Sequence, residues 1–188
     1  MKIVLSENQY QRLIEAEEKP KILEFPSLEF FDNNPFEAWK IIQKIIERKG
    51  NPPYSIDGDL YLAETPIESL GNLQSVGGSL NLLGTPIKSL ENLQSVGWDL
   101  NLLGTPIKSL GNLQSVVWDL DLEGTPIESL GSLVSVGGFL DLRRTPIKSL
   151  GNLESVGGKL YLHGTPLSKM YTEKQIREMV NVEGDIYL

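Results

Sequence analysis

The chain has 188 residues and a net charge of −8 at pH 7, and it contains no cysteine. An acidic surface repels phosphate backbones, which argues against nucleic-acid binding. The lack of cysteine excludes a disulfide framework and fits a reducing compartment. The stretch from Lys2 to Leu5 is too short for a signal sequence, and no apolar run approaches the length of a membrane span. We therefore expect a soluble, cytoplasmic protein that binds neither nucleic acid nor membrane.

Residues 1–32 are expected to form a short strand-like start, a helix and an extended arm. Ser6 and Gln9 have the spacing of a helical capping box. Proline at both ends of residues 20–26 favours an extended conformation there. Residues 27–31 are unusually aromatic for a linker, and we expect them to pack either on the rest of the chain or on a partner.

Residues 33–53 are expected to form a capping helix. Asn34 is a favourable N-cap, Pro35 fits the first helical position, and the Gly-Asn-Pro-Pro of residues 50–53 ends the helix. Its apolar face consists of Phe36, Trp39, Ile42, Ile45 and Ile46. The first unit of a stacked repeat has an uncovered apolar end and an unpaired strand edge, which this face would cover. The alternative is a docking helix for another protein.

Residues 54–168 repeat one sequence pattern with a period of about twenty residues, which is the signature of a solenoid. Each copy begins with a Leu-x-Leu step, and these steps start at Leu60, Leu80, Leu100, Leu120, Leu140 and Leu160. Burying the apolar positions of one copy contributes less than ordering its backbone costs. The copies must therefore stack and share one core.

Within each copy, the first and third residues of Leu-x-Leu face inward because side chains alternate along a strand. The Thr-Pro that follows ends the strand, since proline has no N–H to donate. We expect the threonines to form an internal ladder in which each hydroxyl bonds a turn carbonyl or amide: Thr65, Thr85, Thr105, Thr125, Thr145 and Thr165. A Gly-Gly pair such as Gly77-Gly78 makes the corner before the next strand.

The pattern Leu-x-Leu-x-x-Thr-x-Ile-x-x-Leu resembles the leucine-rich repeat, with Thr in place of the usual Asn. The phrase Leu-x-x-Val-Gly-Gly-x-Leu-x-Leu also resembles the receptor L domain of insulin-receptor-type ectodomains. The absence of cysteine departs from those receptors. The resemblance implies a mainly β solenoid with a right-handed coil and a single parallel sheet of about seven short strands. It also implies a recognition scaffold, because such solenoids bind many unrelated partners.

Residues 169–188 are expected to form a short C-terminal helix and a closing strand. Thr172 and Gln175 form a capping box, and the helix would run through Ile176, Met179 and Val180. The last strand, residues 185–188, repeats the Leu-x-Leu step as Ile-Tyr-Leu. It leaves an open strand edge, so we expect a monomer, with edge-to-edge dimerisation as the alternative.

The outward positions of the strands differ from copy to copy, which marks this face as the candidate binding surface. Trp98 and Trp118 replace glycines of the other copies, and exposed clustered aromatics suit a protein-binding hot spot. The alternative is that both tryptophans pack over the corner with the leucines. The predicted anchors are Trp98, Trp118, Phe139 and Tyr161.

Acidic residues gather on neighbouring copies beside two arginines. We expect a solvated acidic patch with local ion pairs, in which Asp99, Asp119, Asp121, Asp141, Arg143 and Arg144 specify a partner. A calcium site is the less favoured reading, since no calcium-loop spacing is present. We assign no metal ligands.

No pattern supports catalysis. Carboxylates on a solvated strand face lack the apolar pocket that would raise one pKa. His163 has no nucleophile pattern nearby, and Gly157-Gly158-Lys159 lacks the spacing of a phosphate-binding loop. We therefore predict a non-catalytic scaffold without cofactor that binds a partner protein through the strand face. The alternatives are an assembly component that docks through its N-terminal arm, or a cation- or carbohydrate-binding module.

Overall fold

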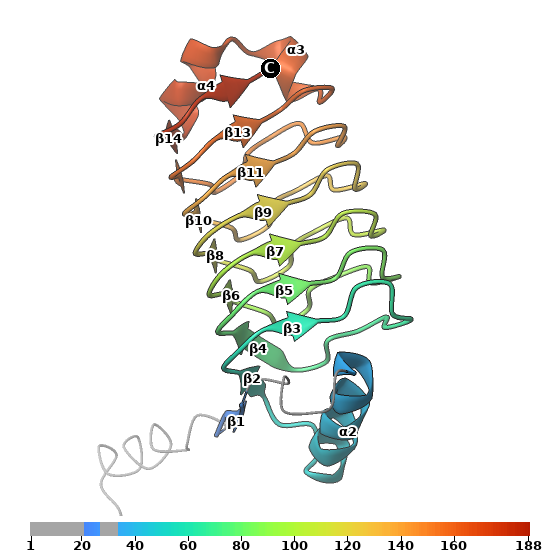
Figure 1. The fold of residues 1–188 in the computed structure, drawn as a ribbon. Coiled ribbons are helices and arrows are strands. Elements are labelled where there is room, and N and C mark those ends of the chain that lie inside the picture. Colours follow the sequence, from blue (N-terminus) through green and yellow to red (C-terminus); the bar gives the residue numbers. More distant parts are fainter. Residues whose placement is uncertain (1–20, 27–33) are drawn as a thin grey trace, which may run out of the picture.

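A computed structural model of the chain describes residues 21–26 and 34–188. The helix expected around Ser6 and Gln9 and the aromatic stretch of residues 27–31 lie outside the described residues. The described chain winds into a parallel β-solenoid, with a helix at its N-terminal end and two short helices at its C-terminal end (Figure 1). The mainly β solenoid with terminal helices, as expected from the repeats, is confirmed.

The Leu-x-Leu steps form one parallel sheet, here named sheet B, with seven strands among the described residues. Leu60 pairs with Leu80, and the same twenty-residue register continues through Leu100, Leu120, Leu140 and Leu160 to Ile186. The strands are β3 (Leu60–Tyr61), β5 (Leu80–Asn81), β7 (Leu100–Asn101), β9 (Leu120–Asp121), β11 (Leu140–Asp141), β13 (Leu160–Tyr161) and β15 (Ile186–Tyr187).

The expectation of a single sheet was incomplete, because the described residues form a second parallel sheet, named sheet A. In most coils it consists of the Ser-Val step that precedes the corner, so each coil contributes one strand to each sheet (Figure 1). Its strands are β1 (Leu23–Phe25), β2 (Tyr54–Ile56), β4 (Leu73–Val76), β6 (Ser95–Val96), β8 (Ser115–Val116), β10 (Ser135–Val136), β12 (Ser155–Val156) and β14 (Asn181–Val182).

The core consists of columns of identical side chains that are stacked coil on coil. In the coil that begins at Leu120, both leucines of the step and Ile127, Leu130 and Leu133 have no exposed surface. The threonine after each step is buried from Thr85 onward, and its hydroxyl donates to the carbonyl three residues earlier, as Thr125 does to Leu122 at 2.8 Å. The predicted threonine ladder is confirmed, with hydroxyl distances of 2.6–2.8 Å in all six copies.

The N-terminal end of the core is covered by α2 (Pro35–Arg48). Asn34 caps this helix by accepting a hydrogen bond from the Glu37 amide at 3.2 Å. Trp39 is 3% exposed and lies 6.2 Å, centroid to centroid, from the ring of Tyr54. The Tyr54 hydroxyl donates to the Leu70 carbonyl at 2.7 Å and accepts from Gln43 at 3.0 Å, and burial raises the pKa of this phenol. The helix is therefore attached to the first coil by apolar packing and by the partly buried hydrogen bond from Gln43 to Tyr54.

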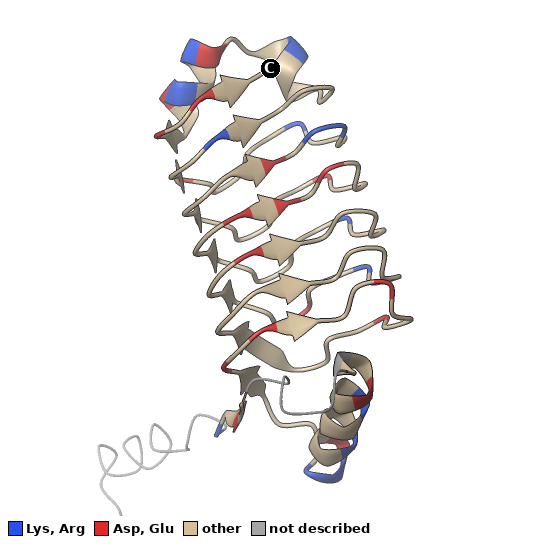
Figure 2. Ribbon diagram, viewed as in Figure 1, with Lys and Arg blue, Asp and Glu red and all other residues tan. Residues whose placement is uncertain are grey.

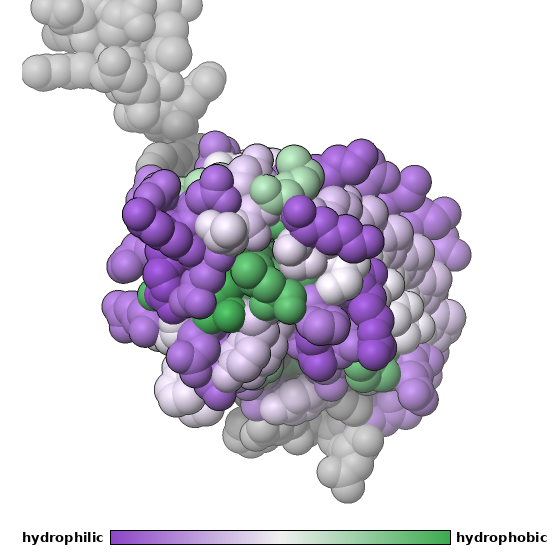
Figure 3. All heavy atoms as spheres, turned by 90° about the horizontal axis from the view of Figure 1, so that it is seen from above, coloured by the Kyte–Doolittle hydropathy of each residue, from purple (hydrophilic) through white to green (hydrophobic). Residues whose placement is uncertain are grey.

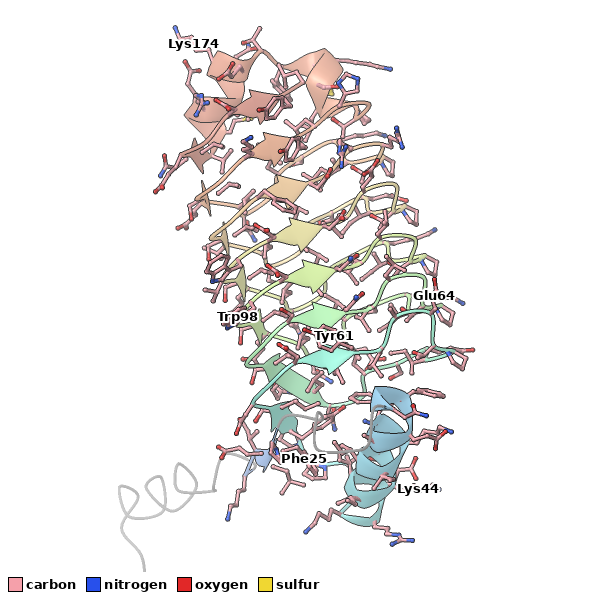
Figure 4. The ribbon with its side chains drawn as sticks, viewed as in Figure 1. Phe25, Lys44, Tyr61, Glu64, Trp98 and Lys174 are labelled. Carbon is pink, nitrogen blue, oxygen red and sulfur yellow. The ribbon has the colours of Figure 1, made fainter. Side chains whose placement is uncertain are left out.

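Part of the N-terminal arm also belongs to the solenoid. β1 extends sheet A by pairing in parallel with β2, Leu23 opposite Tyr54. The ring of Phe25 meets that of Tyr54 edge-on at 6.1 Å. Phe25 lies beneath the first coils (Figure 4). The extended conformation expected around residues 20–26 is present, and its reason is strand pairing as well as the prolines.

At the C-terminal end, α3 (Leu167–Met170) and α4 (Glu173–Met179) replace the outer arc of the last coil. The expected capping box is present in α4: the Gln175 backbone N–H donates to the Thr172 hydroxyl, and the Thr172 backbone N–H donates to the side-chain oxygen Oε1 of Gln175. Ile176 is buried against the core, as its helical spacing predicts.

One outer-arc position adopts the left-handed backbone conformation in five successive coils. It holds Gly71, Gly111, Gly131 and Gly151 at φ between +59° and +61°, but Glu91 at φ +53°. A left-handed residue with a Cβ costs roughly 1–2 kcal/mol. Glycine in turn lowers the stability of the fold by roughly 0.4–1 kcal/mol, because it increases the conformational entropy of the unfolded chain. We therefore expect Glu91→Gly to raise the free energy of unfolding by about 0.5–1 kcal/mol, measured by urea denaturation.

Glu91 also accepts a hydrogen bond from the exposed Ser69 hydroxyl at 2.7 Å, which the substitution removes. The matched control is Glu128→Gly, since Glu128 is exposed and lies outside the left-handed region. That change should destabilise the protein. Equal effects of the two substitutions would contradict the strain at Glu91.

Candidate functional site

Trp98 and Trp118 are exposed at the corner between the two sheets. Their exposed fractions are 56% and 55%, and their rings stack with centroids 5.9 Å apart and planes at 15°. The side chain of Trp98 lies at this corner, outside the core (Figure 4). The alternative that the two tryptophans pack over the corner with the leucines is therefore wrong. We name this pair the tryptophan corner.

A second aromatic group lies on the outer face of sheet B near its C-terminal end. The ring of Phe139 meets that of Tyr161 edge-on at 6.2 Å, and Tyr161 stacks on Tyr187 at 4.9 Å. Arg143 lies 5.5 Å from the Tyr161 centroid, and Lys159 lies 5.7 Å from that of Tyr187. Stacked aromatic pairs with a cation over the ring are favourable contacts. We name these residues the tyrosine cluster.

The anchors predicted from sequence thus fall into two groups that Phe139 links. Phe139 touches Tyr161 and also lies near Trp118, with which it lines one hollow. The selection of anchors missed Tyr187 and Lys159. The available signal was the register, because the closing Ile-Tyr-Leu step places Tyr187 beside Tyr161.

The aspartates that precede the Leu-x-Leu steps bond the backbone of the next coil. Asp59 accepts from the Ser79 amide at 2.7 Å, Asp99 from the Asp119 amide at 3.1 Å, and Asp119 from the Phe139 amide at 2.8 Å. These amides would otherwise lack a partner at the corner, where the strand ladder is interrupted. Asp99 and Asp119 therefore have a structural role in addition to any contact with a partner protein.

The residue between the two leucines of a step has a different local role. Asp121 accepts from the amide of Glu123 at 2.9 Å, and Asp141 accepts from that of Arg143 at 3.0 Å. Asn81 and Asn101 make the same bond in the preceding coils, at 3.1 and 3.0 Å. Such side-chain turns suit either Asn or Asp. Whether Asn or Asp occupies this position therefore sets the charge of the outer face of sheet B and does not change the fold.

The two arginines neutralise part of the acidic row, as expected. Arg143 donates Nε to both oxygens of Asp141, at 2.9 and 2.8 Å, and its Nη2 lies 2.7 Å from Glu123. Arg144 pairs with Glu123 at 3.1 Å. Asp141 is only 3% exposed. Figure 2 shows these acidic strand residues in red, with basic residues on the loops that follow. The local ion pairs predicted from sequence are present.

Asp121 has no such cationic partner at hydrogen-bond distance among the described side chains. Burial raises its pKa above the ordinary value of 3.8; the Glu123 amide lowers it, the nearby carboxylates of Asp141 and Glu123 raise it again, and the charge of Arg143 lowers it by a smaller amount. A raised pKa means that the folded protein holds the proton more tightly than the unfolded chain does. Ionised Asp121 therefore destabilises the fold above its folded pKa, and this cost disappears as the pH falls below 3.8.

We expect Asp121→Asn to stabilise the protein by about 0.5 kcal/mol at pH 7, the size of a partly screened surface charge interaction. Asparagine keeps the oxygen that accepts from Glu123, as Asn101 does for Leu103. Urea denaturation at several pH values should show the gain shrinking towards pH ~3–4, where the wild-type carboxylate is protonated.

Asp141→Asn is the matched control, because it removes the charge of the carboxylate that accepts from Nε of Arg143 and leaves Arg143 with Glu123 as its ionic partner. We expect a loss of about 1.5–3 kcal/mol, the size of a hydrogen bond to a charged group. If both substitutions changed stability in the same direction, the assignment of Asp121 as the unpaired charge would be wrong.

Apolar side chains also gather at the C-terminal end of the solenoid (Figure 3). Met170, Met179 and Leu188 are exposed there. On the sheet A side of this end, Arg177 donates to the carbonyls of Val182 at 2.6 Å and Gly184 at 2.9 Å. Carbonyls bonded in this way are not available to a further strand. Arg177 thus blocks part of the edge of sheet A, whereas the edge considered for dimerisation is that of the last strand of sheet B, β15.

His163 is exposed, and its Nδ1 lies 2.9 Å from the backbone oxygen of Leu188. In the parts of the chain that the structure describes, no group of three or more His, Cys, Asp or Glu side chains is arranged to hold a metal ion. No helix among residues 21–26 and 34–188 is long and apolar enough to cross a membrane. No protein-family model matches the chain, and no curated protein or solved structure matches it either.

Proposed function

We propose that this chain is a leucine-rich-repeat-like, non-catalytic scaffold that binds a partner protein through the outer face of sheet B and the adjoining tryptophan corner. The observation that carries the proposal is the exposed, stacked pair Trp98 and Trp118. Large aromatic side chains are costly to leave in water, and they dominate the energetics of protein interfaces. Neither tryptophan is needed by the fold, since the other coils have glycine at this position.

The second support is the alternation of aromatic and charged groups around the tryptophan corner. The tyrosine cluster lies on one side and the Glu123, Asp141 and Arg143 ion pairs lie beside it. An apolar centre with a polar rim is the usual organisation of a protein interface. Cytoplasmic location and a monomeric state remain predictions from the sequence.

The assembly alternative rests on residues 1–32 acting as a free arm. It is less favoured because Leu23–Phe25 pairs with β2 and packs on Tyr54. The cation alternative is less favoured because Asp99, Asp119 and Asp141 already bond backbone amides or an arginine.

The proposal is tested by site-specific photo-crosslinking in an extract of the source cells. A photoreactive phenylalanine replaces Leu103, which is half-exposed on the strand face, or Lys108, which is exposed on the outer arc. We expect one discrete crosslinked protein from position 103 and none from position 108.

The decisive variant combines Trp98→Gly and Trp118→Gly, which restores the residue found in the other coils and so should preserve the fold. Removing a hot-spot residue costs at least ~2 kcal/mol, equivalent to about 30-fold in affinity. The crosslinked product from position 103 should therefore disappear while the circular dichroism spectrum stays unchanged. An undiminished product would disprove the proposal.

A further inference from the structure

A hollow of about 440 Å³ lies beside the tryptophan corner, over the two coils that follow Trp118. Its volume is within the range of sites that hold a ligand or a large side chain. Glycine backbone forms its floor, and Trp118, Phe139 and Lys159 are the large side chains around it. The glycines are Gly137, Gly138 and Gly158.

The hollow lies in line with the stacked tryptophans. Trp98, Trp118, Gly138 and Gly158 occupy the same position in four successive coils. One face of the Trp118 ring is covered by Trp98, and the next coil offers no ring to cover the other face, because it has Gly138 there. The stack therefore stops beside the hollow, and a third planar ring would continue it.

The floor of the hollow is close-packed backbone. A Cβ on Gly137 would lie 2.0 Å from the Val117 carbonyl oxygen, and one on Gly158 would lie 2.8 Å from that of Gly138. The ladder bonds of Gly138 and Gly158 are 2.8 Å, whereas that of Trp118 is 3.3 Å. Glycine thus allows the coils to approach closely here and leaves the space above them empty. A site with such a fixed floor needs little rearrangement to accept a ligand.

The side of the hollow away from Trp118 carries a positive charge. Lys159 is exposed and forms no ion pair with any side chain in residues 21–26 and 34–188. The carboxylate of Asp119, which also lines the hollow, accepts a hydrogen bond from the Phe139 amide. A ligand with a carboxylate next to its ring would complement this arrangement.

We propose that the hollow binds an aromatic side chain of a partner peptide, stacked on Trp118, with a neighbouring carboxylate of that peptide paired to Lys159. This rests on the proposed function and specifies the chemistry of the partner: an aromatic residue next to an acidic one or at a free C-terminus. Base–aromatic stacking by a nucleic acid is not favoured, because the chain has a net charge of −8.

The test is a titration with N-acetyl-L-tryptophan, which carries a carboxylate, and with its neutral amide, followed by amide and indole NMR shifts. We expect millimolar binding that shifts Gly137, Gly138, Gly158 and the Trp118 indole N–H. The acid should bind at least threefold more tightly than the amide. This preference should vanish in Lys159→Gln and weaken in high salt.

Two substitutions test whether N-acetyl-L-tryptophan binds in the hollow. Gly138→Trp fills the space with a ring that two other coils carry at this position, and it should abolish binding. Its Cβ would lie 2.0 Å from Asp119 Oδ1 and 2.9 Å from the Trp118 carbonyl carbon, so the Asp119 side chain and this corner must shift to admit it. Trp118→Gly should also abolish it, so the test does not depend on one variant folding. Trp98→Gly is the control, because it removes the distal ring and leaves the hollow intact; binding should persist.

Shifts elsewhere, equal binding of N-acetyl-L-leucine, or binding undiminished in both Gly138→Trp and Trp118→Gly would overturn the aromatic site. The crosslinking experiment separates this failure from failure of the proposed function. If Gly138→Trp still gives the crosslinked partner and the double glycine variant does not, the scaffold function stands and only the aromatic site is disproved.

Discussion

Replacing Leu120 by alanine is expected to lower the free energy of unfolding by about 3–5 kcal/mol, the cost of a fully buried leucine whose cavity cannot collapse. Leu120 has no exposed surface and lies in register between Leu100 and Leu140. Because the surrounding coils are fixed by their strand ladders, they cannot move in to fill the space. Urea denaturation followed by circular dichroism measures the loss, without interference from the fluorescence of the neighbouring Trp118.

The matched control is Leu103→Ala, a half-exposed leucine on the outer face of the preceding coil. It should cost less than about 1 kcal/mol, as surface substitutions do. A further comparison is Ile186→Ala in β15, which pairs with one strand among the described residues, that of Leu160. In a solenoid, stability is a sum over neighbouring units, so a defect in the middle should cost more than one at the last strand. Similar losses at positions 103 and 120 would contradict the stacked core.

Sheet B and the core could be predicted because their signal is repeated. The Leu-x-Leu step alternates with period two, and the same residues return every twenty positions, so in-register stacking is the arrangement that buries all of them. Sheet A could not be predicted in this way. Four of its eight strands contain only Ser-Val, and two residues carry no period from which a strand can be recognised. The strand β1 was even harder to predict, because the strand with which it pairs, β2, follows only after α2 in the sequence.

The orientation of Trp98 could not be derived from strand alternation, because alternation holds only inside a strand. The strand of that coil begins at Leu100, so Trp98 lies in the corner before it. Its exposure follows from the close approach of successive corners, which leaves no interior space for an indole ring. For a Cβ on Gly97, for example, the Gly77 carbonyl oxygen would be only 2.0 Å away.

For the acidic residues, a binding role was predicted from the sequence and a structural one was overlooked. Asp99 and Asp119 were selected because acidic residues gather on neighbouring copies beside two arginines, yet each bonds the amide of the next coil. The sequence did contain a signal for this role. The corresponding positions in earlier coils are Asp59 and Ser79, which also have short side chains with an acceptor oxygen. From position 59 to position 119 this column keeps an acceptor oxygen while its charge changes, and such a pattern indicates a backbone contact.

Replacing Trp39 by alanine is the second substitution with a large expected effect. Trp39 is the largest side chain of α2 in contact with the first coil, and its truncation should cost about 3–5 kcal/mol. The loss should be greatest in the first coils, since stability in a solenoid passes from neighbour to neighbour. Hydrogen exchange of the Tyr54 and Ile56 amides should accelerate strongly, while that of Leu140 changes less.

Ile41→Ala on the same helix provides the control, because Ile41 is 47% exposed and should cost little. The pair of variants distinguishes a cap from a docking helix. A cap is part of the fold, so Trp39→Ala must destabilise the solenoid even in the isolated protein. A docking helix would matter only when its partner is present. If Trp39→Ala left the denaturation midpoint and the exchange of Tyr54 unchanged, the end of the core would not depend on α2, and the apolar face of the helix would need another occupant.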